Sequence, residues 1–165
     1  MYGAPLAGAL WLVKVRLPEN YTIGSLCWSG LIGNPVVAPL VGGAATPFIG
    51  IRADTVSGAA NWFLVCGDGT TETTLDLGVV AGQTWQILGF RRLLDGSIQG
   101  LVGDAKSGWR GYIVDVIGTI STHIPTTSLE PTPLGLISWV NEEQKRAQID
   151  FWDLGGPATR QQSPT

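Results

Sequence analysis

Residues 61–85 read NWFLVCGDGTTETTLDLGVVAGQTW. The stretch contains an apolar run, a glycine-aspartate-glycine break, a threonine-rich run in which apolar and polar residues alternate, and a second glycine break. Alternation with a period of two is typical of β-strands, because successive side chains point to opposite faces of a sheet. Glycine and aspartate at the breaks favour tight turns. The stretch therefore predicts strand, turn, strand, turn and strand.

The same pattern recurs along the chain. Strand-like runs separated by turn residues are 11–17, 21–32, 47–53, 61–66, 72–77, 85–92, 97–102, 111–117, 134–140 and 146–154. Asp95-Gly96 is the strongest hairpin signal, because both residues tolerate the positive φ angles of tight turns, and Asn141 to Gln144 connects the last two runs. The sequence contains no convincing amphipathic helix. This organisation predicts an all-β fold, a two-sheet sandwich or a barrel.

Composition narrows the class of protein. The 165 residues suit a single domain, which we expect at 10–154 between terminal tails at 1–9 and 155–165. Charged residues make up 14% of the chain and its net charge is −3, so neither nucleic acid nor an anionic membrane is an expected partner. The first basic residue, Lys14, follows an apolar stretch, the reverse of the order in a secretory signal, and we expect a soluble chain that is not exported.

Beyond these patterns, the sequence resembles the concanavalin A-like lectin/glucanase domains of many bacteriophage structural proteins. The resemblance spans about residues 10–154 and rests on the order of several short motifs: FIGIR (48–52), NWF (61–63), GDGTTET (67–73), LGV (77–79), TWQ (84–86), DGS (95–97), IPTTS (124–128) and QIDFWDL (148–154). It implies a jelly-roll sandwich of two antiparallel sheets, one of them curved. It does not by itself imply sugar binding or catalysis.

The sequence lacks the motifs of the usual enzymes. Glucanases of this fold carry Glu-x-Asp-x-x-Glu or a close variant on one strand, which this chain does not contain, and Glu142-Glu143 falls in an expected turn. The single histidine, His123, stands before Ile124-Pro125 and is expected to be a turn or packing residue, because the sequence places no partners for a zinc site or a triad around it. We expect no catalytic residue, cofactor or metal.

Asp68 and the two cysteines have two interpretations each. Asp68 lies between two glycines, where it either forms the turn or donates a ligand to calcium, and the turn is favoured because no Asp-rich loop supplies further oxygens. Cys27 and Cys66 stand in apolar strand-like runs, which favours two buried free thiols over a disulfide.

The seven tryptophans divide by context. Those within alternating runs, which we expect in the core, are Trp11, Trp62, Trp85 and Trp152; Trp28 and Trp139 stay open. Trp109 differs, because its segment is rich in glycine and charge and is typical of a loop. There Trp109, Lys106 and Arg110 form a candidate contact for a glycan or a protein partner; the alternative is a loop tryptophan that folds over the sheet edge.

No charged residue and no histidine occurs from Asn20 to Ile51, and the middle of this segment is an apolar, proline-rich loop. Large exposed apolar patches are rare on monomers, so we expect an interface with a partner, although the loop would also be accommodated over the end of its own domain. The candidate interface residues are Pro35, Val36, Val37, Pro39, Leu40 and Val41.

The sequence therefore predicts a non-enzymatic virion protein, assembled in the host cytoplasm. A phage capsid decoration (cement) protein is the leading hypothesis, with the major capsid protein and further copies of itself, as a trimer or through lattice contacts, as partners. The alternative is a tail-fibre or receptor-binding module that binds a cell-surface glycan. A polysaccharide hydrolase is the third hypothesis.

Overall fold

The computed structural model of the protein describes residues 8–17, 25–34, 46–54, 61–103, 114–138 and 148–155. These ranges contain ten strands: β1 (Leu10–Arg16), β2 (Ser25–Ile32), β3 (Phe48–Asp54), β4 (Asn61–Gly67), β5 (Glu72–Val80), β6 (Gln86–Arg92), β7 (Ile98–Gly103), β8 (Val114–Ile120), β9 (Glu130–Ser138) and β10 (Gln148–Gly155). Within them, no helix is long and apolar enough to cross a membrane.

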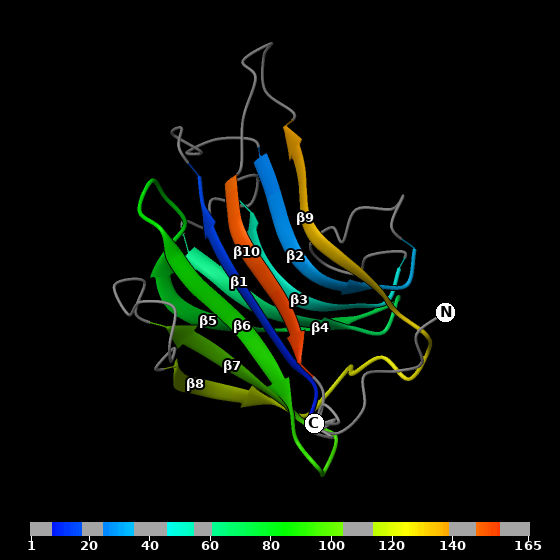
Figure 1. Ribbon diagram of the computed structural model, residues 1–165. Helices are drawn as coiled ribbons and strands as arrows, with labels where there is room; N and C mark the ends of the chain where they lie inside the picture. The colour runs from blue at the N-terminus through cyan, green and yellow to red at the C-terminus, as the bar shows by residue number, and fades with distance from the viewer. Residues whose placement is uncertain are drawn as a thin grey trace, which may run out of the picture.

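The strands form two antiparallel sheets of five, so the predicted two-sheet sandwich is confirmed. Sheet A has the order β10-β1-β6-β7-β8 and sheet B the order β5-β4-β3-β2-β9. In Figure 1, β1, β10 and β6 lie in front of β3 and β4. The first and last described strands are neighbours in sheet A, where Leu10 pairs with Gly155, so β10 forms one edge of this sheet.

The core lies between the two sheets. One face of each sheet contributes apolar side chains, which include Trp11 and Phe90 from sheet A and Trp62 and Leu64 from sheet B. The rings of Trp11 and Phe90 stack with centroids 6.3 Å apart. Both core tryptophans donate hydrogen bonds across the sandwich, Trp11 Nε1 to Ser29 Oγ at 3.2 Å and Trp62 Nε1 to Gln86 Oε1 at 2.7 Å. These bonds satisfy the indole N–H groups of both tryptophans and link the two sheets.

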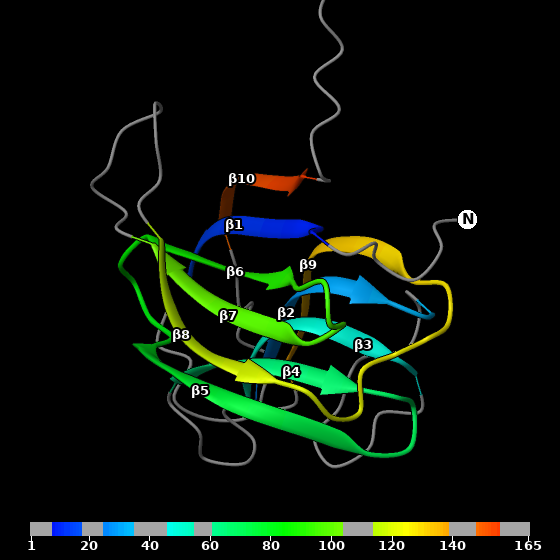
Figure 2. The ribbon, with the colours of Figure 1, turned by 90° about the horizontal axis from the view of Figure 1, so that it is seen from below.

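Strands β5 and β8 close one side of the sandwich, where they run side by side (Figure 2). Glycines make this approach possible. A Cβ at Gly100 would lie 2.8 Å from Leu77 Cδ2, and one at Gly118 would lie 2.9 Å from Leu75 Cδ2. Leucine side chains of sheet B thus occupy the space next to these two glycines of sheet A.

The predicted hairpin at Asp95-Gly96 is confirmed. It joins β6 to β7, which pair from Arg92 with Ile98 onward. Gly96 has a φ of 87°, and Asp95 Oδ1 accepts hydrogen bonds from the backbone N–H and the hydroxyl of Ser97. In contrast, the last two strands are not a hairpin pair, because β9 belongs to sheet B and β10 to sheet A.

Two strands extend beyond their predicted bounds. The strand expected at 111–117 continues to Ile120, and the strand expected at 134–140 begins earlier, at Glu130; residues 111–113 and 139–140 lie outside the described ranges. The part of β9 before the expected start contains Pro131 and Pro133. They are tolerated because β9 is an edge strand with an irregular register against β2, and proline occurs at sheet edges and bulges, where its missing N–H breaks no ladder.

Candidate functional site

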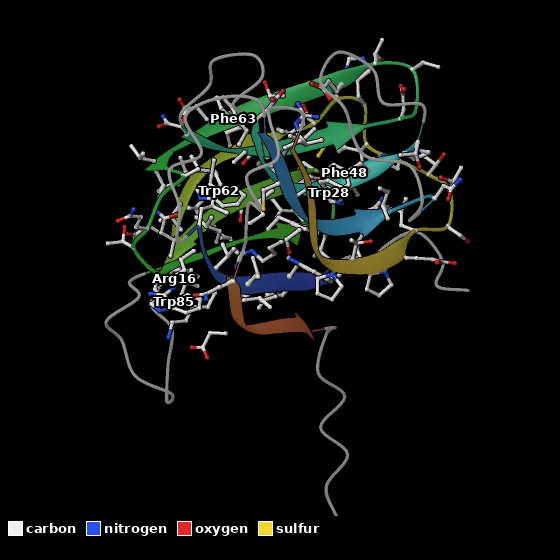
Figure 3. The ribbon with its side chains drawn as sticks, turned by 90° about the horizontal axis from the view of Figure 1, so that it is seen from above. Arg16, Trp28, Phe48, Trp62, Phe63 and Trp85 are labelled. Carbon is white, nitrogen blue, oxygen red and sulfur yellow. The ribbon has the colours of Figure 1, made fainter. Side chains whose placement is uncertain are left out.

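The outer face of sheet B carries a second apolar cluster. In β2, β3 and β4, residues that alternate with the core residues face away from sheet A, and the buried apolar ones are Leu26, Trp28, Ile32, Phe48 and Val65. Phe63 packs against them and is half-buried. Figure 3 shows Trp28, Phe48 and Phe63 on this sheet. These strands therefore carry apolar side chains on both faces, and alternation alone does not distinguish the core face.

Glycines on neighbouring strands let these aromatic rings lie against the sheet. The indole of Trp28 occupies the space that a Cβ at Gly135 would fill. The ring of Phe48 covers Gly50 in the same way, with Phe48 Cζ 2.6 Å from the position of such a Cβ. An alanine at Gly135 or Gly50 would displace the aromatic ring that packs against that glycine.

Two buried polar atoms of β2 and β9 have no hydrogen-bond partner among the described residues: Trp28 Nε1 and Thr132 Oγ1. Trp28 is paired with Gly135, and Thr132 with Gly30, which places both side chains on the outer face because paired residues project to the same side of a sheet. An unpaired buried polar atom costs about 1–3 kcal/mol.

An ion pair lies at the edge of the same cluster. Arg52 of β3 donates from both terminal nitrogens to the two carboxylate oxygens of Glu72 on β5, at 2.8 and 2.7 Å. The side chains are 4% and 10% exposed. Bidentate geometry with this burial fixes both groups, so the Glu72 carboxylate is held as a structural counter-ion.

The other described carboxylates of β3 and β5 are Asp54 and Asp76. Asp54 is buried. Asp76 is exposed and accepts hydrogen bonds from Asn61 Nδ2, 3.0 Å from each of its oxygens, and from the backbone N–H of Gly78. Within the described ranges, no group of three or more His, Cys, Asp or Glu side chains is arranged to hold a metal ion.

A different group of side chains lies on the outer face of sheet A. Arg16 Cζ is 4.7 Å and Lys14 Nζ is 5.4 Å from the centroid of the Trp85 ring. On β10, Asp150 pairs with Lys14 at 2.7 Å and Gln148 accepts from Arg16 Nε at 2.6 Å. We name these five residues the Trp85 cluster. Figure 3 shows Arg16 beside Trp85, on the opposite side of the molecule from Phe63.

The prediction that Trp85 lies in the core is wrong. Trp11 and Trp62 are fully buried in the core as expected, but Trp85 is half-buried and lies outside it. Trp85 precedes β6, where it stands beside Arg16 on the outer face. Lys14 and Arg16 are two residues apart and alternate with Val13, Val15 and Leu17, which are in the core. This spacing places both cations on one face of the strand and was the sequence signal for a charged cluster there. Only the pairing of β1 with β6 brings Trp85 to them.

Asp68 forms a turn. Its Oδ1 accepts hydrogen bonds from the backbone N–H and hydroxyl of Thr70 and from the backbone N–H of Thr71. These bonds, the one from the Thr71 backbone foremost, hold the pKa of the Asp68 carboxyl well below its usual range. The geometry agrees with the turn interpretation of Gly67-Asp68-Gly69.

His123 and the cysteines also take the places expected of them. His123 lies in the turn after β8 with a φ of 53°, and its Nδ1 is 2.7 Å from the hydroxyl of Thr73. Cys27 and Cys66 are buried free thiols. Burial raises the pKa of both thiols, that of Cys66 to about 12, so neither is a reactive thiolate.

Several predicted site residues lie outside the described ranges. They are the interface residues Pro35, Val36, Val37, Pro39, Leu40 and Val41, the contact residues Lys106, Trp109 and Arg110, and the Glu142-Glu143 pair. The roles assigned to them stay predictions.

Comparisons with known proteins bear on the fold. No protein-family model matches the sequence, and no curated protein matches it either. Among solved structures, the chain is similar to the β-glucanase of Bacillus licheniformis with a TM-score of 0.53 and 16% sequence identity. The match covers 89% of this chain and 65% of the glucanase, less than two thirds of that protein. The chain has a concanavalin A-like, glucanase-like β-sandwich fold.

Proposed function

We propose that this protein is a non-enzymatic virion structural protein, specifically a capsid decoration (cement) protein displayed on the surface of a phage particle. The observation that carries the proposal is the outer face of sheet B. Trp28, Phe48 and Val65 are buried there, and the Glu72 carboxylate at its edge is neutralised by Arg52. A face of this kind favours a scaffold over a catalytic cleft.

A hydrolase would need a different arrangement of carboxylates. Retaining and inverting glycosidases use two carboxyl groups about 5 to 10 Å apart that flank the sugar. Glu72 is committed to its ion pair, and Asp76 is tied to Asn61 and the turn at Gly78. These partners of Glu72 and Asp76 argue against a β-glucanase reaction that uses this pair of carboxylates, in spite of the shared fold.

Two features of the sequence support the virion location. The order of motifs resembles the concanavalin A-like domains of phage structural proteins, and the apolar segment with Pro35, Val37 and Leu40 is suited to contacts with neighbouring subunits. The partners of the protein are then the major capsid protein and other copies of itself.

Mass spectrometry of purified virions, combined with electron microscopy of particles with and without the protein, tests the proposal. We expect the protein in the virion and a density on the outer capsid surface that disappears when it is omitted. Absence from purified particles, or a density on the tail, would reject the capsid assignment.

A glycan-binding module of a tail fibre or receptor-binding protein is the second candidate. The Trp85 cluster favours it, because a partly exposed indole between cations on a rigid sheet suits the binding of a sugar. A glycan array separates the candidates, since a decoration protein without this activity binds no glycan at millimolar concentration.

A further inference from the structure

The Trp85 cluster holds a cation whose hydrogen-bonding capacity is only partly used. Arg16 donates from Nε to Gln148, and no residue in the described part of the chain accepts from its two terminal nitrogens. The indole of Trp85 and the amide of Gln148 hold the guanidinium in place from two sides. A guanidinium fixed in this way presents its two terminal nitrogens to a planar anion, with little entropy left to lose on binding.

The local charge balance favours an anion. The net charge of the chain is −3, but among the described residues of this cluster two cations meet one carboxylate. Asp150 neutralises Lys14 at 2.7 Å, whereas Arg16 is paired with a neutral amide. Both cations lie close to the same ring, so they repel each other, and a bound carboxylate would relieve that repulsion.

The indole narrows the class of anion. The faces of aromatic rings are electron-rich and attract the weakly positive C–H groups of a sugar ring. The Arg16 guanidinium lies over the Trp85 ring, with Cζ 4.7 Å from the ring centroid. A hexuronic acid carries its carboxylate directly on the ring, so a single sugar unit at the rim of this stack contacts the guanidinium with its carboxylate and the remaining indole surface with its C–H groups. The acidic side chain of a peptide would engage only the guanidinium.

We propose that Arg16, Trp85 and Lys14 form a binding site for a hexuronic acid unit of an acidic polysaccharide. The carboxylate pairs with the terminal nitrogens of Arg16, the sugar ring lies against the exposed part of Trp85, and Lys14 adds positive charge. The proposal specifies the ligand class of the second candidate function, on which it rests, and is independent of where the protein sits on a particle.

The test is a titration of the full chain with oligogalacturonate and with a neutral galactose oligomer of the same length, followed by tryptophan fluorescence and calorimetry. The expected result is binding of the acidic oligomer alone, weakened by added salt because exposed charges are screened over about 10 Å at 0.1 M. Arg16→Gln and Trp85→Leu are each expected to weaken binding about tenfold, and Trp85→Phe less, because it keeps a ring.

Arg91→Gln is the matched control. Arg91 lies exposed on another part of the same sheet face and also pairs with a glutamine, Gln99, but no tryptophan ring among the described side chains lies against its guanidinium. Its substitution should leave binding unchanged. Asp150→Asn should act in the opposite direction and tighten binding about threefold, because it frees Lys14 and removes a competing carboxylate. Circular dichroism of each variant verifies that it is folded.

The outcomes separate the inference from the function on which it rests. Equal binding of both oligomers, or equal losses in Arg16→Gln and Arg91→Gln, would overturn the acidic-sugar site while leaving glycan binding in place. No binding of any oligosaccharide at millimolar concentration would overturn both.

Discussion

Asp68 shows how a single carboxylate stabilises a turn. Its folded pKa lies below the usual range because backbone and hydroxyl donors of Thr71 and Thr70 bind the ionised form. In the unfolded chain this carboxyl titrates at about 3.9. The stabilisation is therefore fully present above that pH and is lost as the pH falls toward the lower folded pKa.

We expect Asp68→Asn to reduce this pH dependence, because the amide oxygen still accepts hydrogen bonds but does not titrate. Urea unfolding at about pH 6 and about pH 3 measures the effect: the midpoint of the wild type should fall more between the two conditions than that of the variant. Equal falls would show that Asp68 does not contribute to the acid sensitivity.

The second prediction for single residues concerns the reactivity of the Cys27 and Cys66 thiols. Both are buried and have raised thiol pKa values, so neither forms the thiolate that reacts with disulfide reagents. In native buffer at about pH 8 a thiol reagent should label neither cysteine within minutes, and in denaturant it should label both at once. Rapid labelling of the native protein would place a cysteine at the surface.

At the scale of elements, glycines decide how closely strands and rings approach. A Cβ at Gly89 of β6 would collide with the carbonyl oxygen of Trp11 on β1, whereas a Cβ at Gly67 would make only ordinary contacts, the nearest at 3.5 Å. Gly89→Ala should therefore cost about 3 kcal/mol of unfolding free energy and Gly67→Ala less than about 1 kcal/mol. Chemical denaturation of both variants compares them, and equal costs would contradict the close approach of β1 and β6.

The second prediction for secondary-structure elements concerns the stability that the ion pair between β3 and β5 provides. Glu72→Gln replaces the carboxylate that the 4% exposed Arg52 side chain binds with a neutral amide, which should destabilise the fold by about 3 kcal/mol. Asp76→Asn on the same strand is the matched control: its carboxylate is exposed, and the amide still accepts hydrogen bonds. A stability of Glu72→Gln equal to that of Asp76→Asn would show that the pair is not buried in solution.

For the whole molecule, we predict self-association through the apolar segment 35–41. Burying even about 400 Å² of apolar surface is worth on the order of 10 kcal/mol before the costs of association, and closed symmetry favours a ring such as a trimer. Light scattering should detect an oligomer that Val37→Asp and Leu40→Asp dissociate. A monomer whose solubility and capsid binding are unchanged by both substitutions would show that the segment packs on its own domain.

The sequence by itself determined where the strands and turns lie. Alternation located the ten described strands, β8 and β9 with shifted bounds, and turn chemistry identified the hairpin at Asp95-Gly96 and the turn at Asp68, because both signals are local and depend on residues only a few positions apart. The buried thiols were predicted for the same reason, from apolar neighbours in the same strand.

Only the tertiary structure decided which sheet each strand joins, which face is the core, and what the surface presents. A period of two assigns side chains to two faces without saying which is buried, and β2, β3 and β4 are apolar on both. Trp85 was expected in the core and instead lies beside Lys14 and Arg16. Arg52 and Glu72 likewise meet from β3 and β5, which are not neighbours in the sheet. Such contacts join residues far apart in the chain, and strand pairing alone brings them together.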